Sequence, residues 1–143
     1  VLPDMLRRNR GHICNIASAG GMLGNPKMSV YGASKWAVIG WSESMRIELQ
    51  QRQANVHVTT VAPYFISTGM FAGVRSIFPI LKPEPTAKKI IRAIERNTIF
   101  AGIPFGYHFI RFWQAILPLR VFDWLFGTVF GIYRTMDHFT GRK

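Results

Sequence analysis

Three things are scarce in this chain: cysteine, acidic residues and long uncharged apolar runs. The single cysteine, Cys14, excludes a disulfide within the chain and is neutral between compartments. Only 7 aspartates and glutamates stand against 18 lysines and arginines, which leaves a formal net charge of +11 over 143 residues. The basic excess is spread along the chain rather than gathered in a stripe, so it favours an anionic membrane surface over nucleic acid as a partner.

No segment is long and apolar enough to predict a membrane-spanning helix. Such a helix needs about 20 mainly apolar residues, whereas the uncharged runs 112–119 and 124–133 hold eight and ten residues, and Pro118 divides the region. The four histidines show no metal-ligand spacing, so we expect no bound metal. A hydrophobic fraction of 48% is nevertheless ample for the core of one domain, or of part of one.

Apolar patterns predict secondary structure from the start of the chain to residue 104. The expected strands are 11–17, 56–61 and 98–103, the expected helices are 28–52 and 85–97, and 1–9 looks like the end of a helix. Helical spacing in 28–52 is followed by Val38, Ile39, Trp41, Met45 and Leu49. In 85–97 the residues expected to face inward are Ala87, Ile90, Ile91 and Ile94.

The most informative feature is Tyr31 with Lys35 four positions later and Ser18 thirteen positions earlier. On a helix, Tyr31 and Lys35 lie on one face, one turn apart. A free tyrosine titrates near pH 10 and is a poor acid or base at neutral pH, but an ammonium held beside a phenol favours the phenolate. Ser18 follows the strand 11–17, and open α/β sheets place ligand contacts at the carboxyl ends of their strands. The three side chains could therefore share one proton-transfer site.

The order and spacing of these motifs resemble the short-chain dehydrogenase/reductases. Asn-Ile-Ala-Ser at 15–18 closes a strand, Tyr-Gly-Ala-Ser-Lys at 31–35 opens a helix, and the strand 56–61 runs into Ala-Pro and then Thr-Gly-Met at 68–70. The resemblance covers roughly residues 1–104. It implies an α/β fold: the carboxy-terminal half of a Rossmann-like, doubly wound parallel sheet, followed by a helical, aromatic-rich tail over 105–143.

The resemblance also implies a reaction. In that family the serine orients the substrate oxygen, the tyrosine donates or accepts the proton, and the lysine tunes the tyrosine while it holds the nicotinamide ribose. These catalytic roles fall on Ser18, Tyr31 and Lys35, with Ser18 and Tyr31 in contact with the substrate. The implied activity is hydride transfer between NAD or NADP and a carbonyl or secondary alcohol.

The segment 63–68 carries the second part of the resemblance. The family usually has Pro-Gly-x-Ile/Val-x-Thr here, lying against the nicotinamide carboxamide, and this chain has Pro-Tyr-Phe-Ile-Ser-Thr. The match implies cofactor contacts at Pro63, Ile66 and Thr68. It departs from the family at Tyr64, since glycine reaches backbone conformations that tyrosine avoids.

The family's amino-terminal features are not found in the sequence: a glycine-rich phosphate turn, a ribose selector, an Asn-Ala-Gly segment and a catalytic asparagine. The glycine cluster 20–24 is a weak match for the phosphate turn, because no acidic residue follows about twenty positions later. Val1 is not an initiator methionine. We therefore expect the chain to be the carboxy-terminal half or so of an enzyme, inactive by itself.

Two segments bear on the substrate and partners. The irregular apolar segment 64–83 predicts either a lid over a hydrophobic substrate or a loop packed on the core. The tail 105–143 holds 11 of the chain's 19 aromatic residues, interspersed with arginines. It predicts either amphipathic helices in a membrane interface or helices that cover the pocket or a dimer contact.

Several alternatives stay open. The resemblance implies a homodimer or tetramer, with Trp36 and Trp41 either at the seam between helices of two copies or in the core. We expect a cytoplasmic protein, or one peripheral at a membrane, with a small hydrophobic alcohol or carbonyl substrate and no nucleic acid. The rival functions are an epimerase or dehydratase relative that recycles its nicotinamide, and a non-catalytic membrane-associated or scaffolding fragment.

Overall fold

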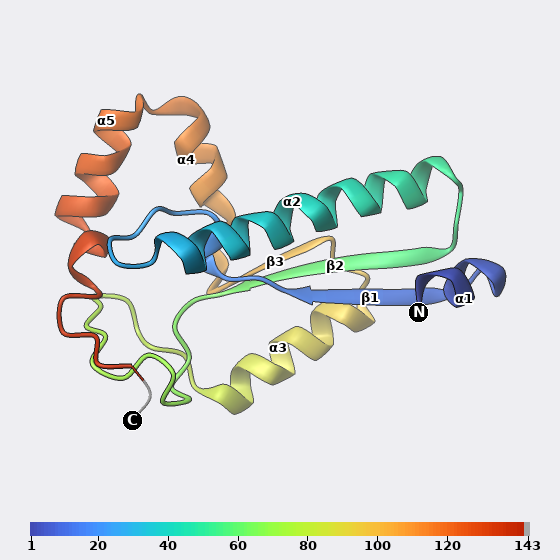
Figure 1. Cartoon of the computed structure of the whole chain (residues 1–143), viewed down its shortest axis with the longest axis horizontal. Coiled ribbons are helices and arrows are strands. Elements are labelled where there is room, and N and C mark those ends of the chain that lie inside the picture. Colours follow the sequence, from blue (N-terminus) through green and yellow to red (C-terminus); the bar gives the residue numbers. More distant parts are fainter. Residues whose placement is uncertain (142–143) are drawn as a thin grey trace.

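A parallel three-stranded sheet forms the centre of the computed structural model, which describes residues 1–141 (Figure 1). The strands β1 (Gly11–Ile16), β2 (Val56–Pro63) and β3 (Phe100–Ile103) lie in the order β1-β2-β3. Gly11 pairs with Val56 at one end of the sheet, and Pro63 pairs with Ile103 at the other. Arg142 and Lys143, which end the predicted tail, lie outside the described residues.

Helices cover both faces of the sheet, which confirms the predicted Rossmann-like α/β fold (Figure 1). α2 (Ser29–Gln51) connects β1 to β2 along one face, and α3 (Pro83–Glu95) connects β2 to β3 along the other. The short α1 (Leu2–Arg7) precedes β1. Parallel neighbours require such crossovers, because a tight turn cannot join strands that run in the same direction.

α2 is fixed to the sheet by a narrow apolar stripe and one buried polar residue. Ile39, Met45 and Leu49 are buried at helical spacing. Ser42 is 1% exposed, and its hydroxyl donates to the Val38 carbonyl at 2.6 Å while it accepts from the Asn15 amide at 2.9 Å. Because the Ser42 hydroxyl both donates and accepts a hydrogen bond, this polar residue can be buried between α2 and the sheet.

The predicted burial is wrong at several positions. Trp41 is 58% exposed and Trp36 49% exposed, which excludes the core interpretation of these tryptophans within residues 1–141. On α3, Ile91 is 53% exposed and Ala87 is also exposed, whereas Thr86 and Ala93 are buried. The Thr86 hydroxyl donates to the Lys82 carbonyl at 2.7 Å, so this polar residue can be buried without an unpaired group.

The tail is a series of short helical segments. They are η2 (Phe105–Phe109), α4 (Ile110–Ile116), α5 (Leu119–Phe122), the π-helix η3 (Asp123–Val129) and η4 (Ile132–Arg134). α4 and α5 with η3 form a hairpin that stands away from the sheet (Figure 1). Buried residues of the tail, such as Ile110 and Ile132, share one apolar cluster with Ala17 and Ala62 of the body. The predicted division into parts at residue 104 therefore crosses a common core.

Residues 135–140 lie along the segment between β2 and α3. The Arg75 amide donates to the Thr135 carbonyl, and the Thr140 amide donates to the Ala72 carbonyl, both at 3.1 Å. Gly73 has a φ of +83°, and a Cβ added there would lie 2.0 Å from the His138 carbonyl oxygen. Any other residue would be strained by the positive φ and would overlap the His138 backbone, so glycine is needed at this position.

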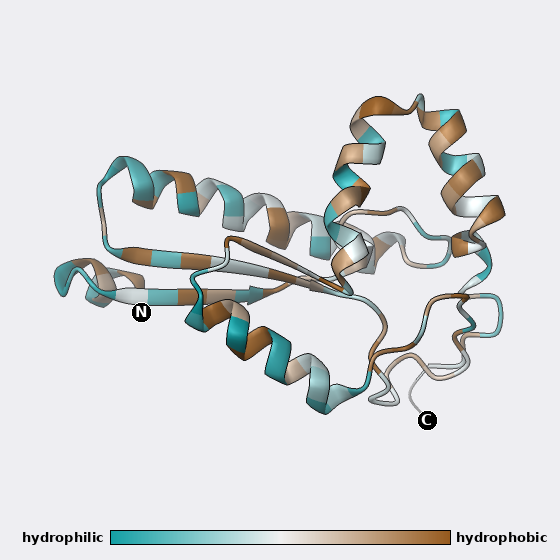
Figure 2. Cartoon of the chain, turned by 180° about the vertical axis from the view of Figure 1, so that it is seen from behind, coloured by the Kyte–Doolittle hydropathy of each residue, from teal (hydrophilic) through white to brown (hydrophobic). Residues whose placement is uncertain are grey.

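The aromatic residues of the tail divide between an inner and an outer face. Phe122 is 4% exposed and Tyr107 is 6% exposed, so both belong to the core. Phe105 and Trp124, by contrast, are 71% and 61% exposed. Apolar residues recur along the projecting hairpin in Figure 2. Among residues 1–141, no helix has the length and apolar character to cross a membrane.

Candidate active site

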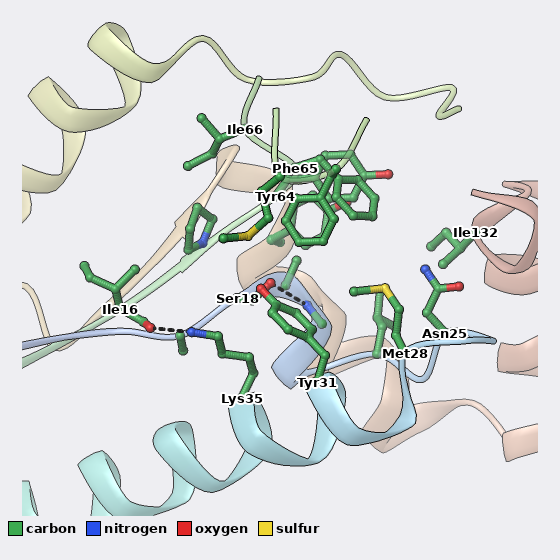
Figure 3. A pocket seen from close by; sticks show the side chains of 18 of the residues that line it. Ile16, Ser18, Asn25, Met28, Tyr31, Lys35, Tyr64, Phe65, Ile66 and Ile132 are labelled. Atoms are coloured by element: carbon green, nitrogen blue, oxygen red, sulfur yellow. Dashed lines mark hydrogen bonds between the residues drawn. The ribbon is translucent and has the colours of Figure 1, made fainter. Parts of the chain in front are cut away.

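A cavity of about 280 Å³ lies where β1 and β2 end (Figure 3). It brings together all six residues that the sequence singled out: Ser18, Tyr31, Lys35, Pro63, Ile66 and Thr68. Most of the remaining wall is apolar and includes Leu23, Met28, Phe65, Met70, Phe71 and Ile132. The convergence follows from the topology, because parallel strands end at the same edge of a sheet. The roles of the six residues stay predictions.

Ser18 is held by the turn that follows β1. It is the N-cap of the 3-10 turn η1 (Ala19–Gly21), and its hydroxyl oxygen accepts a hydrogen bond from the Gly20 amide at 3.1 Å. A Cβ added at Gly20 would lie 3.6 Å from that oxygen and 3.4 Å from the ring of Tyr31. The serine hydroxyl and the tyrosine ring are therefore neighbours above Gly20, with the hydroxyl hydrogen of Ser18 left to donate.

Tyr31 and Lys35 stand on successive turns at the start of α2. The Lys35 ammonium donates to the Ile16 carbonyl at 3.1 Å and lies 5.7 Å from the centroid of the Tyr31 ring. The loop can approach the helix because Gly21 has no side chain: a Cβ there would lie 2.7 Å from the Lys35 carbonyl oxygen. The hydrogen bond to Ile16 and the spacing of one helical turn thus place the Lys35 ammonium beside the Tyr31 ring.

The segment 63–68 begins at the last residue of β2. It does not use the positive φ that a glycine at position 64 would allow. Tyr64 keeps a negative φ, is 8% exposed, and shares a 2.6 Å hydrogen bond with the Ser76 hydroxyl. Burial raises the pKa of Tyr64. Ile66 forms an isolated bridge with Leu81, which brings the segment's side chains to the cavity. The predicted lid segment therefore contributes to both the core and the cavity wall.

The cavity has two sides, separated by Ser18 and Tyr31. In Figure 3, Ile16 and Lys35 lie to one side of this pair, and Asn25 and Ile132 lie to the other. Sequence reasoning missed Asn25, Tyr107 and Ile132, all of which line the cavity. Tyr107 and Ile132 come from the tail, and no motif marks them. Asn25 lies in a loop before a helix, where an asparagine usually forms a turn, so its position gave no reason to expect a cavity residue.

The tail is attached to the loop that precedes α2. The Gln114 amide donates to the Met22 carbonyl at 2.7 Å, the Asn25 amide donates to the Thr135 hydroxyl at 2.8 Å, and the Lys27 ammonium donates to the Met136 carbonyl at 3.4 Å. These bonds hold Ile132 over the cavity. The inner face of the tail therefore covers the pocket, as one of the two predicted interpretations requires.

No metal site accompanies the cavity within the described part of the chain. In residues 1–141, histidine, cysteine, aspartate and glutamate nowhere gather in a group of three or more that could hold a metal ion. Burial raises the pKa of the Cys14 thiol, which leaves it a weak nucleophile.

Comparisons with known proteins find relatives along most of this chain. A family model described as short chain dehydrogenase matches residues 1–77. Epidermal retinol dehydrogenase 2 of Mus musculus is 39% identical over 147 residues, which cover 99% of this chain and 47% of that protein. Retinol dehydrogenase 10 of Homo sapiens is 35% identical over 126 residues, which cover 83% of this chain and 37% of that protein. The chain thus spans about half the length, or less, of these curated relatives.

A solved structure matches the fold. The crystal structure of a short chain dehydrogenase from Burkholderia cenocepacia, in complex with NADP, superposes with a TM-score of 0.67 and 25% identity. The superposition covers 80% of this chain and 46% of that chain. The sheet and its helices are therefore a known architecture.

Proposed function

Because the chain belongs to the short chain dehydrogenase family, we propose that the protein is an NAD- or NADP-dependent oxidoreductase that acts on a hydrophobic alcohol or carbonyl compound. The observation that carries this proposal is the meeting of Ser18, Tyr31 and Lys35 in one mainly apolar cavity. The retinol dehydrogenases among its relatives and the NADP bound to a related structure support it.

The Lys35 side of the cavity fits the nicotinamide end of such a cofactor. The ammonium uses one donor on the Ile16 carbonyl, which leaves others for ribose hydroxyls. Pro63, Ile66 and Thr68 supply a wall that is apolar apart from one hydroxyl. When bound, the cofactor supplies or accepts the hydride.

The residues of the chain would then handle the oxygen and the proton. Ser18 donates its hydroxyl hydrogen to the substrate oxygen, since its own oxygen already accepts from Gly20. Tyr31 gives its proton to that oxygen as negative charge develops there, and Lys35 stabilises the charge left on the phenol. The apolar wall strengthens these interactions by excluding water.

The test is turnover by the complete protein with either cofactor and a panel of apolar alcohols and ketones, followed by nicotinamide absorbance. Tyr31→Phe should lower kcat by about 10²–10⁴-fold, because only the transferable proton is lost. Binding of the reduced cofactor should be nearly unchanged. Tyr133→Phe is the matched control, since the Tyr133 hydroxyl donates to Asp123 outside this cavity. A Tyr31→Phe variant with more than about a tenth of wild-type kcat would refute the assignment.

The same assay separates the rival functions. An epimerase or dehydratase that recycles its nicotinamide would convert substrate with no net change in absorbance. The apolar cavity disfavours the sugar nucleotides that such enzymes use. A scaffolding protein would show no Tyr31-dependent conversion with any compound in the panel.

We propose in addition that the outer face of the tail contacts an anionic membrane surface. Leu119 is 73% exposed and Trp124 61% exposed on the projecting hairpin, and Arg120 is exposed between them. Apolar insertion and attraction of the basic chain to anionic lipid act together at such a surface. The complete protein should co-sediment with vesicles of phosphatidylserine and phosphatidylcholine, and high salt should weaken binding.

Point variants test this proposal better than a deletion, because removing 105–143 would also remove core residues. Leu119→Glu and Trp124→Glu should each weaken vesicle binding severalfold. Ile77→Glu is the control, since Ile77 is 66% exposed but lies outside the tail. Equal binding by all three variants would count against a membrane contact through the hairpin.

Association of two or four copies is also part of the proposal. Trp36 and Trp41 are exposed on α2, and large apolar residues that are exposed on a helix are candidates for contact with a second copy. Light scattering of the wild type and of Trp41→Lys should then give different masses. A monomeric wild type would refute the association.

A further inference from the structure

One wall of the candidate active site has no regular secondary structure. The loop 67–80, which lies between β2 and α3, contains no helix or strand. Thr68, Met70 and Phe71 of this loop line the cavity. The ring of Phe71 lies edge-on to that of Tyr31, with the centroids 5.8 Å apart. The position of the loop therefore decides the shape of the site around the proposed catalytic tyrosine.

Tyr64 connects the second half of this loop to the end of β2. Its amide donates to the Ile103 carbonyl at 2.8 Å, so its backbone continues the sheet. Its hydroxyl shares a 2.6 Å hydrogen bond with the Ser76 hydroxyl, which also accepts from the Phe78 amide at 3.0 Å. Tyr64 is 8% exposed, and a buried polar group that loses its partner is unfavourable. One buried side chain thus anchors residues 76–78.

Tyr107 of the tail belongs to the same group of side chains. Its ring lies beside that of Tyr64, with the centroids 5.1 Å apart. Burial raises the pKa of Tyr107, and the neighbouring Tyr64 phenol raises it further. The Phe78 ring lies edge-on to both, with its centroid 6.2 Å from that of Tyr64 and 6.5 Å from that of Tyr107. Residues from the loop, the strand end and the tail therefore pack in one cluster.

We propose that Tyr64 is a positioning residue: it holds the loop 67–80 over the cavity, so that Met70 and Phe71 are in place before a substrate binds. The hydrogen bond to Ser76 and the packing of Phe78 are formed by the protein alone, so they do not wait for a ligand. A wall that is formed in advance lowers the ordering cost of binding. This inference rests on the proposed function and concerns how its substrate site is maintained.

The alternative is that Tyr64 acts on the substrate directly, since Tyr64 itself lines the cavity. Ser76 separates the two possibilities, because it bonds to Tyr64 but does not line the cavity. If Tyr64 acts through the loop, removing the Ser76 hydroxyl has the same kinetic effect as removing the Tyr64 hydroxyl. If Tyr64 acts on the substrate, the two effects differ.

The first test is steady-state kinetics of the complete protein with the best substrate from the panel of apolar alcohols and ketones. Tyr64→Phe keeps the ring and removes one hydroxyl, so the loop should be in place for only part of the time. KM should rise about five- to tenfold without a fall in kcat, because apparent affinity falls with the competent fraction. Tyr133→Phe is the matched control, since its hydroxyl also forms a 2.6 Å hydrogen bond, to Asp123, and neither residue lines the cavity. An unchanged KM in Tyr64→Phe would overturn the proposal.

A double-mutant cycle assigns the effect to the bond between Tyr64 and Ser76. Ser76→Ala should raise KM by a similar factor, and adding Tyr64→Phe to it should change KM by less than about twofold, because both substitutions remove the same interaction. If Tyr64→Phe fails to fold, Ser76→Ala still decides, since Ser76 is only partly buried. Effects that multiply independently would show that Tyr64 does not act through Ser76, and would overturn the proposal.

Hydrogen exchange gives a readout that needs no substrate. In the complete protein, the amides of Arg75 and Phe78 should exchange at least about fivefold faster in Tyr64→Phe than in the wild type, because loops exchange through local opening. Tyr133→Phe should leave both rates unchanged. Unchanged rates in Tyr64→Phe, or an equal rise in Tyr133→Phe, would mean that Tyr64 does not hold the loop.

The two readouts also separate this inference from the proposed function. Faster loop exchange in Tyr64→Phe, with no turnover of any compound, would support the anchoring of the loop and refute the oxidoreductase. Turnover that depends on Tyr31, with KM and loop exchange unchanged in Tyr64→Phe, would support the oxidoreductase and refute the inference.

Discussion

The side of the cavity that holds Ile16 and Lys35 is fixed by the nearby backbone, whereas the side that holds Asn25 and Ile132 is assembled from distant segments. Lys35 is tied to a carbonyl 19 positions away, but Asn25 is tied to Thr135 across 110 positions. The first side uses a strand end and a helix start that the family shares. The second depends on where the tail lies, so the proposed catalytic residues and the far wall of the cavity can vary separately.

The largest expected effect comes from removing the hydroxyl of Ser18, one of the three proposed catalytic residues. Ser18→Ala in the complete protein should lower kcat by about 10²–10³-fold with a smaller change in KM, because a donor to the substrate oxygen is lost. Ser34→Ala is the control, since the exposed Ser34 hydroxyl donates to the Tyr31 carbonyl and does not line the cavity. Steady-state kinetics measure both. Equal losses in the two variants would mean a general effect on α2.

The next effect breaks the contact between the tail and the segment after β2. Gly69 and Gly73 have nearly the same φ, +84° and +83°, but only at Gly73 would a Cβ meet the His138 backbone. Gly69→Ala should cost about 1–2 kcal/mol of unfolding free energy from the left-handed backbone alone. Gly73→Ala adds overlap and should cost about 3 kcal/mol or more. Urea unfolding gives both values, and equal costs would show that the contact is not maintained in solution.

A smaller effect is expected from shortening Met70, an apolar residue of the cavity wall. Met70 lines the cavity but is 55% exposed, so Met70→Ala should spare the fold. It should raise KM for a long apolar substrate by roughly five- to tenfold, equivalent to about 1–1.5 kcal/mol of lost apolar contact, with kcat nearly constant. A fall in kcat with KM unchanged would move Met70 to the catalytic side.

The smallest effect concerns the ion pair between α2 and the tail. The Arg111 guanidinium donates to Glu43 at 2.9 and 3.3 Å, and this contact lowers the pKa of the Glu43 carboxyl. Because the folded-state pKa lies below the ordinary value of 4.5, the pair's stabilisation is complete above that pH and is lost as pH falls through the folded-state pKa. Both side chains are about half exposed, so the pair contributes about 0.5 kcal/mol or less.

Urea unfolding of Glu43→Gln at neutral and acidic pH measures this contribution. The variant should be less stable than the wild type at neutral pH, and the difference should vanish in acid. Glu48→Gln is the control on the same helix, since Glu48 forms no ion pair within residues 1–141. A pH-independent difference would mean that Glu43 acts through something other than its charge.

Most of the sheet, and the meeting of Ser18, Tyr31 and Lys35 at one cavity, could be predicted from the sequence, because both follow from local patterns. Ser18 closes a strand and Tyr31 opens a helix, and parallel topology brings such ends to one edge. The inner face of α3 could not be read from apolar spacing, since it includes the polar Thr86, whose hydroxyl is satisfied by the carbonyl of the N-cap residue Lys82. Tyr107 and Ile132 gave no signal, because their place depends on packing between segments far apart in the chain.

The aromatic tail has one buried face and one exposed face, so each of the two interpretations of this segment has a structural basis. Its composition suggested either a membrane contact or a cover for the pocket. The structure places Phe122 and Ile132 inside and leaves Leu119 and Trp124 outside. Composition counts residues without assigning them to a face, and only the tertiary contacts separate the two sets.

The attachment of the tail to the loop before α2 sets an order in time during protein synthesis. Ile132 follows Ser18 by 114 positions, so at about 5 to 20 residues per second the ribosome adds it roughly 6 to 23 seconds later. Throughout that interval Leu23 and Met28, which are buried in the finished structure, lack their cover. The nascent chain therefore leaves these two apolar residues of the cavity wall open to chaperones and to aggregation until the segment that covers them has been joined.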